Sequence, residues 1–442
     1  ASMHKGAFEF ALKTDSTILP AFMIREKGPY HRLEILKPIH IDPRDLDRPL
    51  QIKNGMQVFA GILQSFVSRY PEQWLWLHKR WKSTPARTVV VLNDGKAGHL
   101  NQSLGVARII QKYRQDRGYV SGDTKLEVID VKYKSGFHRF LFSLCGMFAS
   151  GACQGCMRCV RFCLEPGSAK KLLHAYADIV ISCGSSLAPV NLCLSKENDA
   201  RSVCIMKPGR LSLKRFSLAV IPKHDGIRPR KNIVVTDGSP NIVDPETMLA
   251  DSKRMEKLTG SSTRRKIGIL LGGNNPDYKM EPDLIKKIAD EIEAVAERLD
   301  LEIMITTSRR TPRSVDNFLK ERFGRSKRCR SLVIANENNV KGAVGGILGL
   351  CDVVVVSGDS SSMISEAASS GKHTLVFLLD KRGRKKTKHD ALIKNLSRQG
   401  CLAVAGPDSM ADAVEGLITN GSRGPKGLGD KEKIYKAVGA LF

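Results

Sequence analysis

Four clusters of glycine, hydroxyl, amide and charged residues could bind a phosphorylated ligand. Glycines let a ligand approach the backbone closely, and hydroxyl and guanidinium groups bind phosphate oxygens. The clusters comprise Asp94, Gly95, Gly98 and His99; Gly272, Gly273 and Asn274; Thr307, Ser308, Arg309 and Arg310; and Ser357, Asp359, Ser360, Ser361, Ser362 and Glu366. We treat these as candidate substrate-binding and catalytic residues.

The first cluster, Asp-Gly-Lys-Ala-Gly-His, joins a predicted strand to a predicted helix over residues 101–111. The N-terminus of a helix attracts anions because its first backbone N–H groups have no partners within the helix. The cluster lacks both the G-x-G-x-x-G pattern and the lysine spacing of a P-loop, so it does not indicate a dinucleotide or ATP site. His99 or Asp94 could serve as a general base. An ordinary tight turn is the alternative.

The other three clusters each end a predicted strand in the second half of the chain. In open α/β sheets, ligands bind at the edge formed by the carboxyl ends of the strands. Any single loop could serve only to cap a helix, since Ser and Asp are common N-cap residues. Three such loops at one edge favour a phosphate or nucleotide site.

Four cysteines follow the spacing of a bacterial ferredoxin. They are Cys153, Cys156, Cys159 and Cys163, with Leu164 where the ferredoxin pattern has proline. This spacing predicts a metal site holding an iron–sulfur cluster. The same cysteines, with Cys145, would also share one face of a single helix as buried structural side chains. Gly151 and Gly155 weaken such a helix, so both interpretations stay open.

From Arg87 onward, short β-branched runs alternate with helical stretches. The predicted strands are 88–92, 126–131, 178–182, 203–207 and 218–222 in a first series, and 266–271, 301–307, 331–335, 352–357 and 374–379 in a second. Strands separated by helices indicate parallel sheets covered on both faces. We expect an α/β fold of two Rossmann-like domains, 87–236 and 266–442, with a loop-rich linker at 237–265 and a cleft between them.

Residues 1–82 follow a different pattern. Apolar runs at 16–26 and 31–41 flank a Lys-Gly-Pro turn, which predicts a hairpin, and residues 51–70 have helical spacing. We expect a small α+β segment that ends before a junction at 83–85.

Composition limits the classes of partner. The 442 residues include 71 Lys+Arg and 45 Asp+Glu, a formal charge of +26, which favours an anionic partner. Aromatic residues are only 6%, without a basic motif interleaved with aromatics, so we expect no nucleic acid partner. Eleven cysteines, an odd and sparse set, indicate a reducing compartment, and no leader or membrane-spanning apolar run is visible. We expect a cytoplasmic protein.

One basic and apolar stretch could bind a membrane. Between residues 132 and 171, seven Lys and Arg face one Glu, and the apolar residues among them are Phe137, Phe140, Leu141, Phe142, Leu144, Met147 and Phe148. Basic residues bind anionic lipid surfaces and aromatics add apolar burial. The alternative is that these aromatics pack into the domain core.

A family resemblance covers about residues 87–442. Segments 92–105 (LNDGKAGHLNQSLG), 181–186, 272–274, 307–310 and 352–371 (DVVVVSGDSSSMISEAASSG) resemble the mitochondrial-fission ELM-like family. That family is similar to GT-B glycosyltransferases. The resemblance implies that the second domain binds a nucleotide-sugar, with Glu366 on the ribose hydroxyls and 360–362 facing the diphosphate. It also implies that Asp94 and His99 face the acceptor.

Residues 1–82 carry a second resemblance. Segments 19–25 and 71–82 are similar to the C-terminal third of the lipid A lauroyl/myristoyl acyltransferases. The catalytic His-x4-Asp/Glu of that family lies well upstream of these segments. His4 and Glu9 share the spacing by coincidence, because they occupy the wrong place. We therefore expect an inactive fragment of a longer fusion, consistent with a start at Ala1.

Together these patterns predict transfer of a sugar from a nucleotide-sugar to a lipid-linked or lipopolysaccharide acceptor. Arg309 or Arg310 would stabilise the leaving diphosphate. The protein would work at the cytoplasmic face of the membrane, as a peripheral protein on an anionic surface. Two other classes are a non-catalytic membrane-associated adaptor that retains the fold and an iron–sulfur protein.

Overall fold

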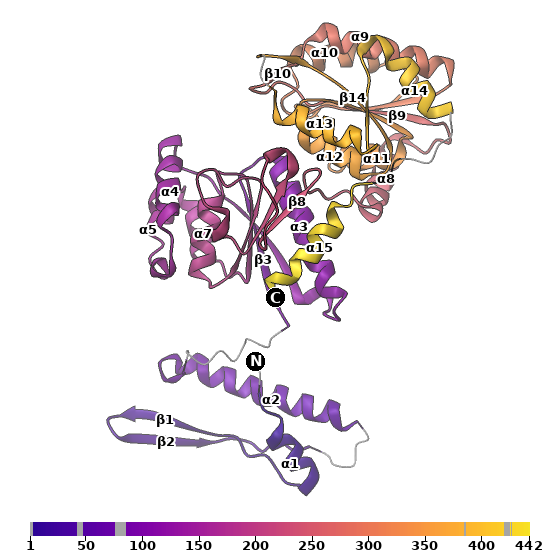
Figure 1. Cartoon of the computed structure of the whole chain (residues 1–442). Helices are drawn as coiled ribbons and strands as arrows, with labels where there is room; N and C mark the ends of the chain where they lie inside the picture. Colours follow the sequence, from indigo (N-terminus) through magenta and orange to yellow (C-terminus); the bar gives the residue numbers. More distant parts are fainter. Residues whose placement is uncertain (1–2, 42–46, 76–84, 384–385, 420–424, 426) are drawn as a thin grey trace. The chain divides into compact units, whose positions relative to one another are not determined.

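The computed structural model describes residues 3–41, 47–75, 85–383, 386–419, 425 and 427–442. The chain divides into two compact units, Ala1–Ala86 and Arg87–Phe442 (Figure 1). This division follows directly after the predicted junction at 83–85 and separates the two resemblances.

The N-terminal unit contains the predicted hairpin and helix. Its elements are α1 (Gly6–Thr14), β1 (Ala21–Lys27), β2 (Tyr30–Ile35), α2 (Arg48–Arg69) and the short η1 (Pro71–Gln73). Strands β1 and β2 are antiparallel, and Gly28 in the turn has φ of 59°, a conformation that favours glycine. Phe22 stacks on Phe66 of α2 with ring centroids 4.0 Å apart, which anchors the hairpin to the helix. Part of the segment that resembles the acyltransferases, 76–84, lies outside the described residues.

The first lobe of the second unit is built on a parallel sheet in the order β4-β3-β5-β6-β7-β8. Its strands are β3 (Arg87–Asn93), β4 (Thr124–Asp130), β5 (Ile179–Cys183), β6 (Arg201–Ile205), β7 (Leu218–Pro222) and β8 (Ile233–Thr236). Its helices are α3 (Ala97–Gln115), α4 (Gly136–Phe148), α5 (Arg158–Cys163), α6 (Pro166–Leu173) and α7 (Ala188–Glu197), with a short η5 (Lys223–Asp225) after β7.

The second lobe has a parallel sheet in the order β12-β11-β9-β13-β14-β16. Its strands are β9 (Lys266–Leu270), β11 (Glu302–Thr306), β12 (Cys329–Val333), β13 (Val353–Ser357), β14 (His373–Phe377) and β16 (Ala403–Val404), and a small pair joins β10 (Tyr278–Lys279) to β15 (Asp380–Lys381). Its helices are α8 (Pro245–Thr259), α9 (Pro282–Arg298), α10 (Arg313–Phe323), α11 (Ala343–Leu350), α12 (Ser361–Ser369), α13 (Lys388–Arg398) and α14 (Met410–Thr419).

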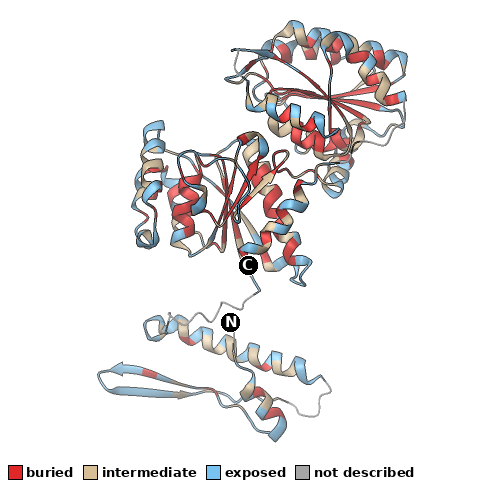
Figure 2. Ribbon diagram, viewed as in Figure 1, coloured by how far each residue is buried: buried red, intermediate tan, exposed pale blue. Residues whose placement is uncertain are grey.

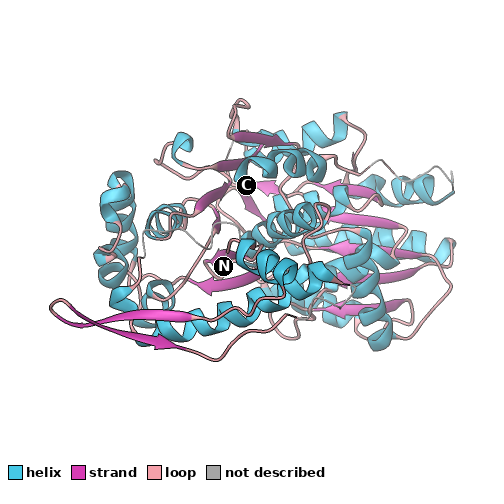
Figure 3. Cartoon of the chain, turned by 90° about the horizontal axis from the view of Figure 1, so that it is seen from below, coloured by secondary structure: helices cyan, strands magenta, loops and turns pink. Residues whose placement is uncertain are grey.

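Strands and α-helices alternate along the second lobe, and along the first lobe as far as β6, after which only three-residue helical turns separate β6, β7 and β8. With two parallel sheets and helices, coloured magenta and cyan in Figure 3, the α/β prediction is confirmed. All ten predicted strands are present among the described residues, shifted by at most two positions at their starts. Strand side chains alternate between the two faces. In the first lobe Val89 and Val91 pack toward α3, and Val90 and Leu92 pack toward α4–α7. The inner strands β5, β7, β9, β11 and β13 are buried along their whole length, whereas the edge strands β4, β12 and β16 are partly exposed (Figure 2).

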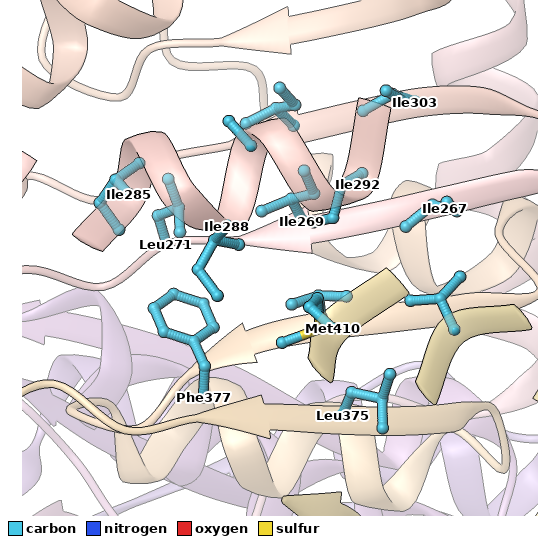
Figure 4. Close-up of a cluster of buried hydrophobic side chains, with 14 of the residues drawn as sticks. Ile267, Ile269, Leu271, Ile285, Ile288, Ile292, Ile303, Leu375, Phe377 and Met410 are labelled. Carbon is cyan, nitrogen blue, oxygen red and sulfur yellow. The ribbon is translucent and has the colours of Figure 1, made fainter. Parts of the chain in front are cut away.

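The second-lobe core follows the same rule. Ile267, Ile269 and Ile303 pack with α9, α10 and α14, as Figure 4 shows for part of this cluster. Met304 and Val354 pack on the opposite face with α8, α11, α12 and α13. A rigid sheet covered on both faces holds the loops at its carboxyl edge in fixed positions.

Two segments do not follow the predicted domain boundaries. The stretch 237–265, expected as a linker, contains α8, and its Met255 is buried in the second-lobe core because it contacts α11. The C-terminal helix α15 (Asp430–Val438) packs on the first lobe, where Ile434 and Val438 join the core beside α3. Its apolar side chains fill the face of the first sheet that α3 leaves open.

Candidate functional site

The sheet order places the predicted loops. In each sheet the chain first adds strands on one side of its first strand and later adds the remaining strands on the other side. Ligands in open α/β sheets bind at the switch point where the direction changes. In the first lobe this point lies between β3 and β5, whose following loops carry Asp94 and Ser186. In the second lobe it lies between β9 and β13, followed by the Gly272 and Asp359 loops.

Asp94 is the centre of the first-lobe site. Its Oδ2 accepts a hydrogen bond from His99 Nδ1 at 3.0 Å and from Ser186 Oγ at 3.1 Å. Lys96 Nζ lies 3.4 Å from the same oxygen. Gly95, with φ of 81°, turns the chain so that His99 on the first turn of α3 faces back toward Asp94. The two predicted catalytic residues are therefore in contact.

The contacts fix the charge of Asp94. Burial alone would raise the pKa of its carboxyl group, but the hydrogen bond from His99 and the positive charges of His99 and Lys96 lower it to about 2. A carboxylate of such low basicity is a poor general base at neutral pH. It is well suited to orient the imidazole, and His99 keeps its second ring nitrogen, Nε2, for proton exchange.

Asp359 organises the second-lobe site. Its buried carboxylate accepts hydrogen bonds from Gly273 N at 2.8 Å and Ser357 Oγ at 2.7 Å, and it lies 3.0 Å from Arg310 Nη2. Ser357 Oγ in turn accepts from Gly272 N at 2.7 Å. One carboxylate thus connects three of the predicted loops.

The remaining predicted residues of this lobe divide into those that shape the loops and those that are exposed. Ser308 Oγ donates to Gly272 O, Thr307 Oγ1 accepts from Ala335 N, and Asn274 Oδ1 accepts from Met280 N. These side chains are occupied by backbone partners. Arg309 and Arg310 are exposed, so their guanidinium groups can reach a ligand.

Two helix N-termini, one from each lobe, meet. Gly98 in the first turn of α3 lies so near Ser362 in the first turn of α12 that a Cβ on Gly98 would sit 3.5 Å from Ser362 Oγ. Ser360 caps α12 and accepts from Met363 N. Both helix ends carry partial positive charge, and their free N–H groups favour an anion.

Glu366 lies between the same two helices. It is 5% exposed, and its Oε1 accepts a hydrogen bond from Asn101 Nδ2 of α3 at 3.4 Å. Burial raises the pKa of Glu366 to about 7, although hydrogen bonds from Asn101 and Ser362 oppose that rise. A buried carboxyl group with such a perturbed pKa is typical of a functional site.

His389, which the sequence analysis missed, lies at the same edge. It is the second residue of α13, its ring packs edge-to-face on Tyr278 with centroids 5.5 Å apart, and the charges of Asp359 and Arg310 act on it. Burial lowers its pKa, as it does for His224 of the first lobe. Among the described residues, Nδ1 of each ring has no hydrogen-bond partner.

Asn101 and Ser186 were quoted within motifs but not singled out, because only the fold brings them to Glu366 and Asp94.

The four ferredoxin-spaced cysteines do not come together as predicted. Cys156 is exposed, Cys163 is buried, and Cys153 lies in a separate short helix. Within the residues that the structure describes, no group of three or more His, Cys, Asp or Glu side chains could hold a metal ion. The single-helix alternative is also wrong, because α4 ends at Phe148 and Met157 adopts a φ of 38° before α5 begins. Cys159 instead contacts Cys193 and Cys145.

The α4–α5 aromatics are largely at the surface. Of the seven apolar residues that the sequence analysis named in this stretch, only Phe142 is fully buried. Phe137, Phe140, Met147 and Phe148 are 68, 53, 39 and 79% exposed, and Phe162 of α5 is 58% exposed. We call these five the α4–α5 patch. Arg139, Arg158 and Arg161 are exposed around it. No helix in the described parts of the chain is long and apolar enough to cross a membrane.

Two Rossmann-like lobes, with loops of both lobes meeting at helix N-termini, define a GT-B-like α/β protein. The family model described as mitochondrial fission ELM1 matches residues 97–413, and the chain belongs to that family. The model of the bacterial lipid A biosynthesis acyltransferases matches residues 2–83. Both resemblances predicted from the sequence are thereby confirmed. No curated protein matches the chain.

Several solved structures are similar at low identity. A putative UDP-N-acetylglucosamine 2-epimerase from Listeria monocytogenes is 11% identical, with 80% of this chain and 91% of that chain covered and a TM-score of 0.45. The UDP-GlcNAc 2-epimerase of Methanocaldococcus jannaschii is 14% identical, with 78% and 97% covered and a TM-score of 0.46. ADP-heptose lps heptosyltransferase II of E. coli is 10% identical, with 75% and 99% covered and a TM-score of 0.42.

Proposed function

We propose that the protein transfers a sugar from a nucleotide-sugar to a lipid-linked or lipopolysaccharide acceptor. The observation that carries this proposal is the meeting of α3 and α12, whose N-termini come from different lobes and enclose Glu366. Two positive helix ends match a diphosphate, and a buried carboxylate matches the hydroxyls of a ribose. The nucleotide-sugar is the donor substrate in this assignment.

The catalytic step follows from the first-lobe contacts. His99, oriented by Asp94, removes the proton from the acceptor hydroxyl as its oxygen attacks the anomeric carbon. The bond from that carbon to the diphosphate breaks, and the departing negative charge is stabilised by the N-terminus of α12 and by Arg310 or Arg309. Of the two candidate bases, the low pKa of Asp94 leaves this role to His99.

Calorimetry with a panel of nucleoside diphosphates tests the donor site. We expect the full chain to bind one of them, and Arg309→Ala to weaken that binding about tenfold through loss of a charge-assisted hydrogen bond. Arg325→Ala, which changes an exposed arginine beyond the end of α10, is the matched control. Binding of no nucleotide would instead favour an adaptor that retains the fold without catalysis.

We further propose that the α4–α5 patch binds an anionic membrane, where a lipid-linked acceptor would lie. Four exposed Phe rings and one Met can enter the interfacial region, and the surrounding arginines complement anionic headgroups. The segment between β4 and α4 connects the carboxyl end of β4 to the patch. In this segment Tyr133 Oη donates to Ser186 O at 2.5 Å. Ser186 is itself bound to Asp94, so the patch adjoins the proposed acceptor site.

Sedimentation with anionic liposomes tests this membrane contact. We expect salt-sensitive binding that falls with Arg158→Glu combined with Arg161→Glu, and that also falls with Phe148→Ser. A matched control is Lys394→Glu, a charge reversal at an exposed position on α13 of the other lobe. Absence of wild-type binding at low salt would contradict the membrane assignment while leaving the nucleotide site untouched.

A further inference from the structure

Three cysteines meet beneath the α4–α5 patch. Cys145 lies on α4, Cys159 on α5 and Cys193 on α7; α4 packs against both α5 and α7, and side chains of all three helices share one core cluster of the first lobe. The helices approach closely because α4 has a glycine at the crossing: a Cβ on Gly146 would lie 2.6 Å from Pro189 Cβ of α7. The three thiols therefore face a common space between the helices.

The thiol of Cys159 is the centre of this group. It lies in contact with the thiols of Cys193 and Cys145. Cys193 is 5% exposed and belongs to the apolar core, whereas Cys159 is only partly buried and borders it. One thiol is thus accessible to a small reagent, and a second lies behind it within reach of the first.

We propose that Cys159 and Cys193 form a redox-active dithiol whose oxidant is a small hydroperoxide. In the first step, the Cys159 sulfur attacks the peroxide, an S–O bond forms and the O–O bond breaks. The departing oxygen takes a proton and leaves as water when the oxidant is hydrogen peroxide. In the second step the Cys193 sulfur attacks the sulfenic acid, an S–S bond forms, and the S–O bond breaks to release a second water. One peroxide is reduced to two waters as two thiols become one disulfide.

The disulfide would act on the acceptor side of the site. It would join α5 to α7, and the loop that leads into α7 carries Ser186, the hydrogen-bond donor to Asp94. The same bond would pin the short α5, which carries Phe162 of the patch, to the core of the lobe. Disulfides in reducing compartments are typically catalytic or redox-sensing rather than structural, which suits a bond formed on demand.

Disulfide mapping tests the proposal. The full-length protein is reduced, freed of reductant and treated with hydrogen peroxide; remaining thiols are then alkylated and the protein is digested without reduction. We expect mass spectrometry to find a peptide linking Cys159 to Cys193 and a loss of two of the eleven thiols per chain. The linkage should reverse with dithiothreitol.

Variants separate this site from general oxidation. Cys193→Ser should abolish the linkage and leave sulfenic acid at Cys159, trapped by dimedone or passed to Cys145. Cys351→Ser, at a buried cysteine of the second lobe, and Cys156→Ser, at an exposed one, should leave the linkage intact. Circular dichroism confirms the fold of each variant. Complete alkylation of Cys159 after peroxide treatment of folded wild-type protein would overturn the proposal, as would a wild-type disulfide that links Cys159 to a cysteine other than Cys193.

Discussion

Glu366 shows how a single buried carboxyl group can oppose stability and serve a site. Its folded pKa of about 7 lies above the ordinary value of 4.5, because burial penalises the charged form. Stability from this group is therefore complete below pH 4.5 and is lost as the pH rises through about 7. Above that pH the protein holds a buried charge that hydrogen-bonds to an amide rather than to a cation.

We expect Glu366→Gln to remove this loss. In urea unfolding at about pH 8.5, the variant should exceed the wild type in free energy of unfolding by roughly 3 kcal/mol, and the difference should shrink by about pH 5. Nucleotide binding should weaken in the same variant. A pH-independent difference in stability would show that the pKa of Glu366 is the same in the folded and unfolded protein, and thus that burial does not raise it.

Asp94 provides the opposite case, a carboxylate held in its charged form. Asp94→Asn would keep the size of the side chain but remove the charge that orients His99, and we expect turnover to fall at least about 100-fold. Calorimetry should give an unchanged nucleotide affinity, since Asp94 belongs to the acceptor side. A variant that keeps full turnover would exclude His99 and Asp94 as a catalytic pair.

At the scale of single residues, the sequence predicted candidate groups but not their partners. Glycine, serine and acidic residues at strand ends marked both switch points. The contact between Asn101 and Glu366 joins residues from different lobes, so no local pattern contains it. His389 belongs to none of the four clusters, and only its packing on Tyr278 reveals its place.

At the scale of elements, the Gly272-Gly273 turn depends on the absence of side chains. A Cβ on Gly273 would collide with the carbonyl oxygen of Arg310. We expect Gly273→Ala to push apart the loops after β9 and β11 and to reduce nucleotide affinity at least about tenfold. Gly122→Ala is the control, because a Cβ there meets no atom within 4 Å. Equal affinities of both variants, measured by calorimetry, would remove the turn from the site.

Strands were easier to predict than the segments between lobes. Buried parallel strands are continuous β-branched runs, such as β13 with four consecutive valines. Strand β8 and helix α8 lie in a stretch rich in turn residues, and their stability comes from packing on the sheet and on α11. The cysteine spacing misled for a related reason: the chain bends at Gly155 and Met157, so ferredoxin spacing no longer sets the distances between thiols.

At the scale of the whole second unit, an ion pair joins the lobes at a point other than the contact between α3 and α12. Lys388 at the start of α13 pairs with Asp225 after β7, whose carboxylate is fully buried. We expect Lys388→Ala to reduce the free energy of unfolding by roughly 1–3 kcal/mol, because it leaves a buried acceptor without its partner. Adding Asp225→Asn should restore part of the loss, and Lys394→Ala should change little. Additive effects of the two substitutions would mean that the pair is not coupled.

The chain passes between the lobes twice, and the two passages are fastened side by side. Asp430 at the start of α15 accepts hydrogen bonds from Asp237 N at 2.8 Å and Gly238 N at 2.7 Å, and Lys433 pairs with Asp237. A lobe attached by one connecting segment can rotate in any direction, whereas a lobe attached by two joined segments rotates mainly about one axis. The lobes would then open and close by a hinge rotation. The N-termini of α3 and α12 would return to the same alignment each time a substrate binds or leaves.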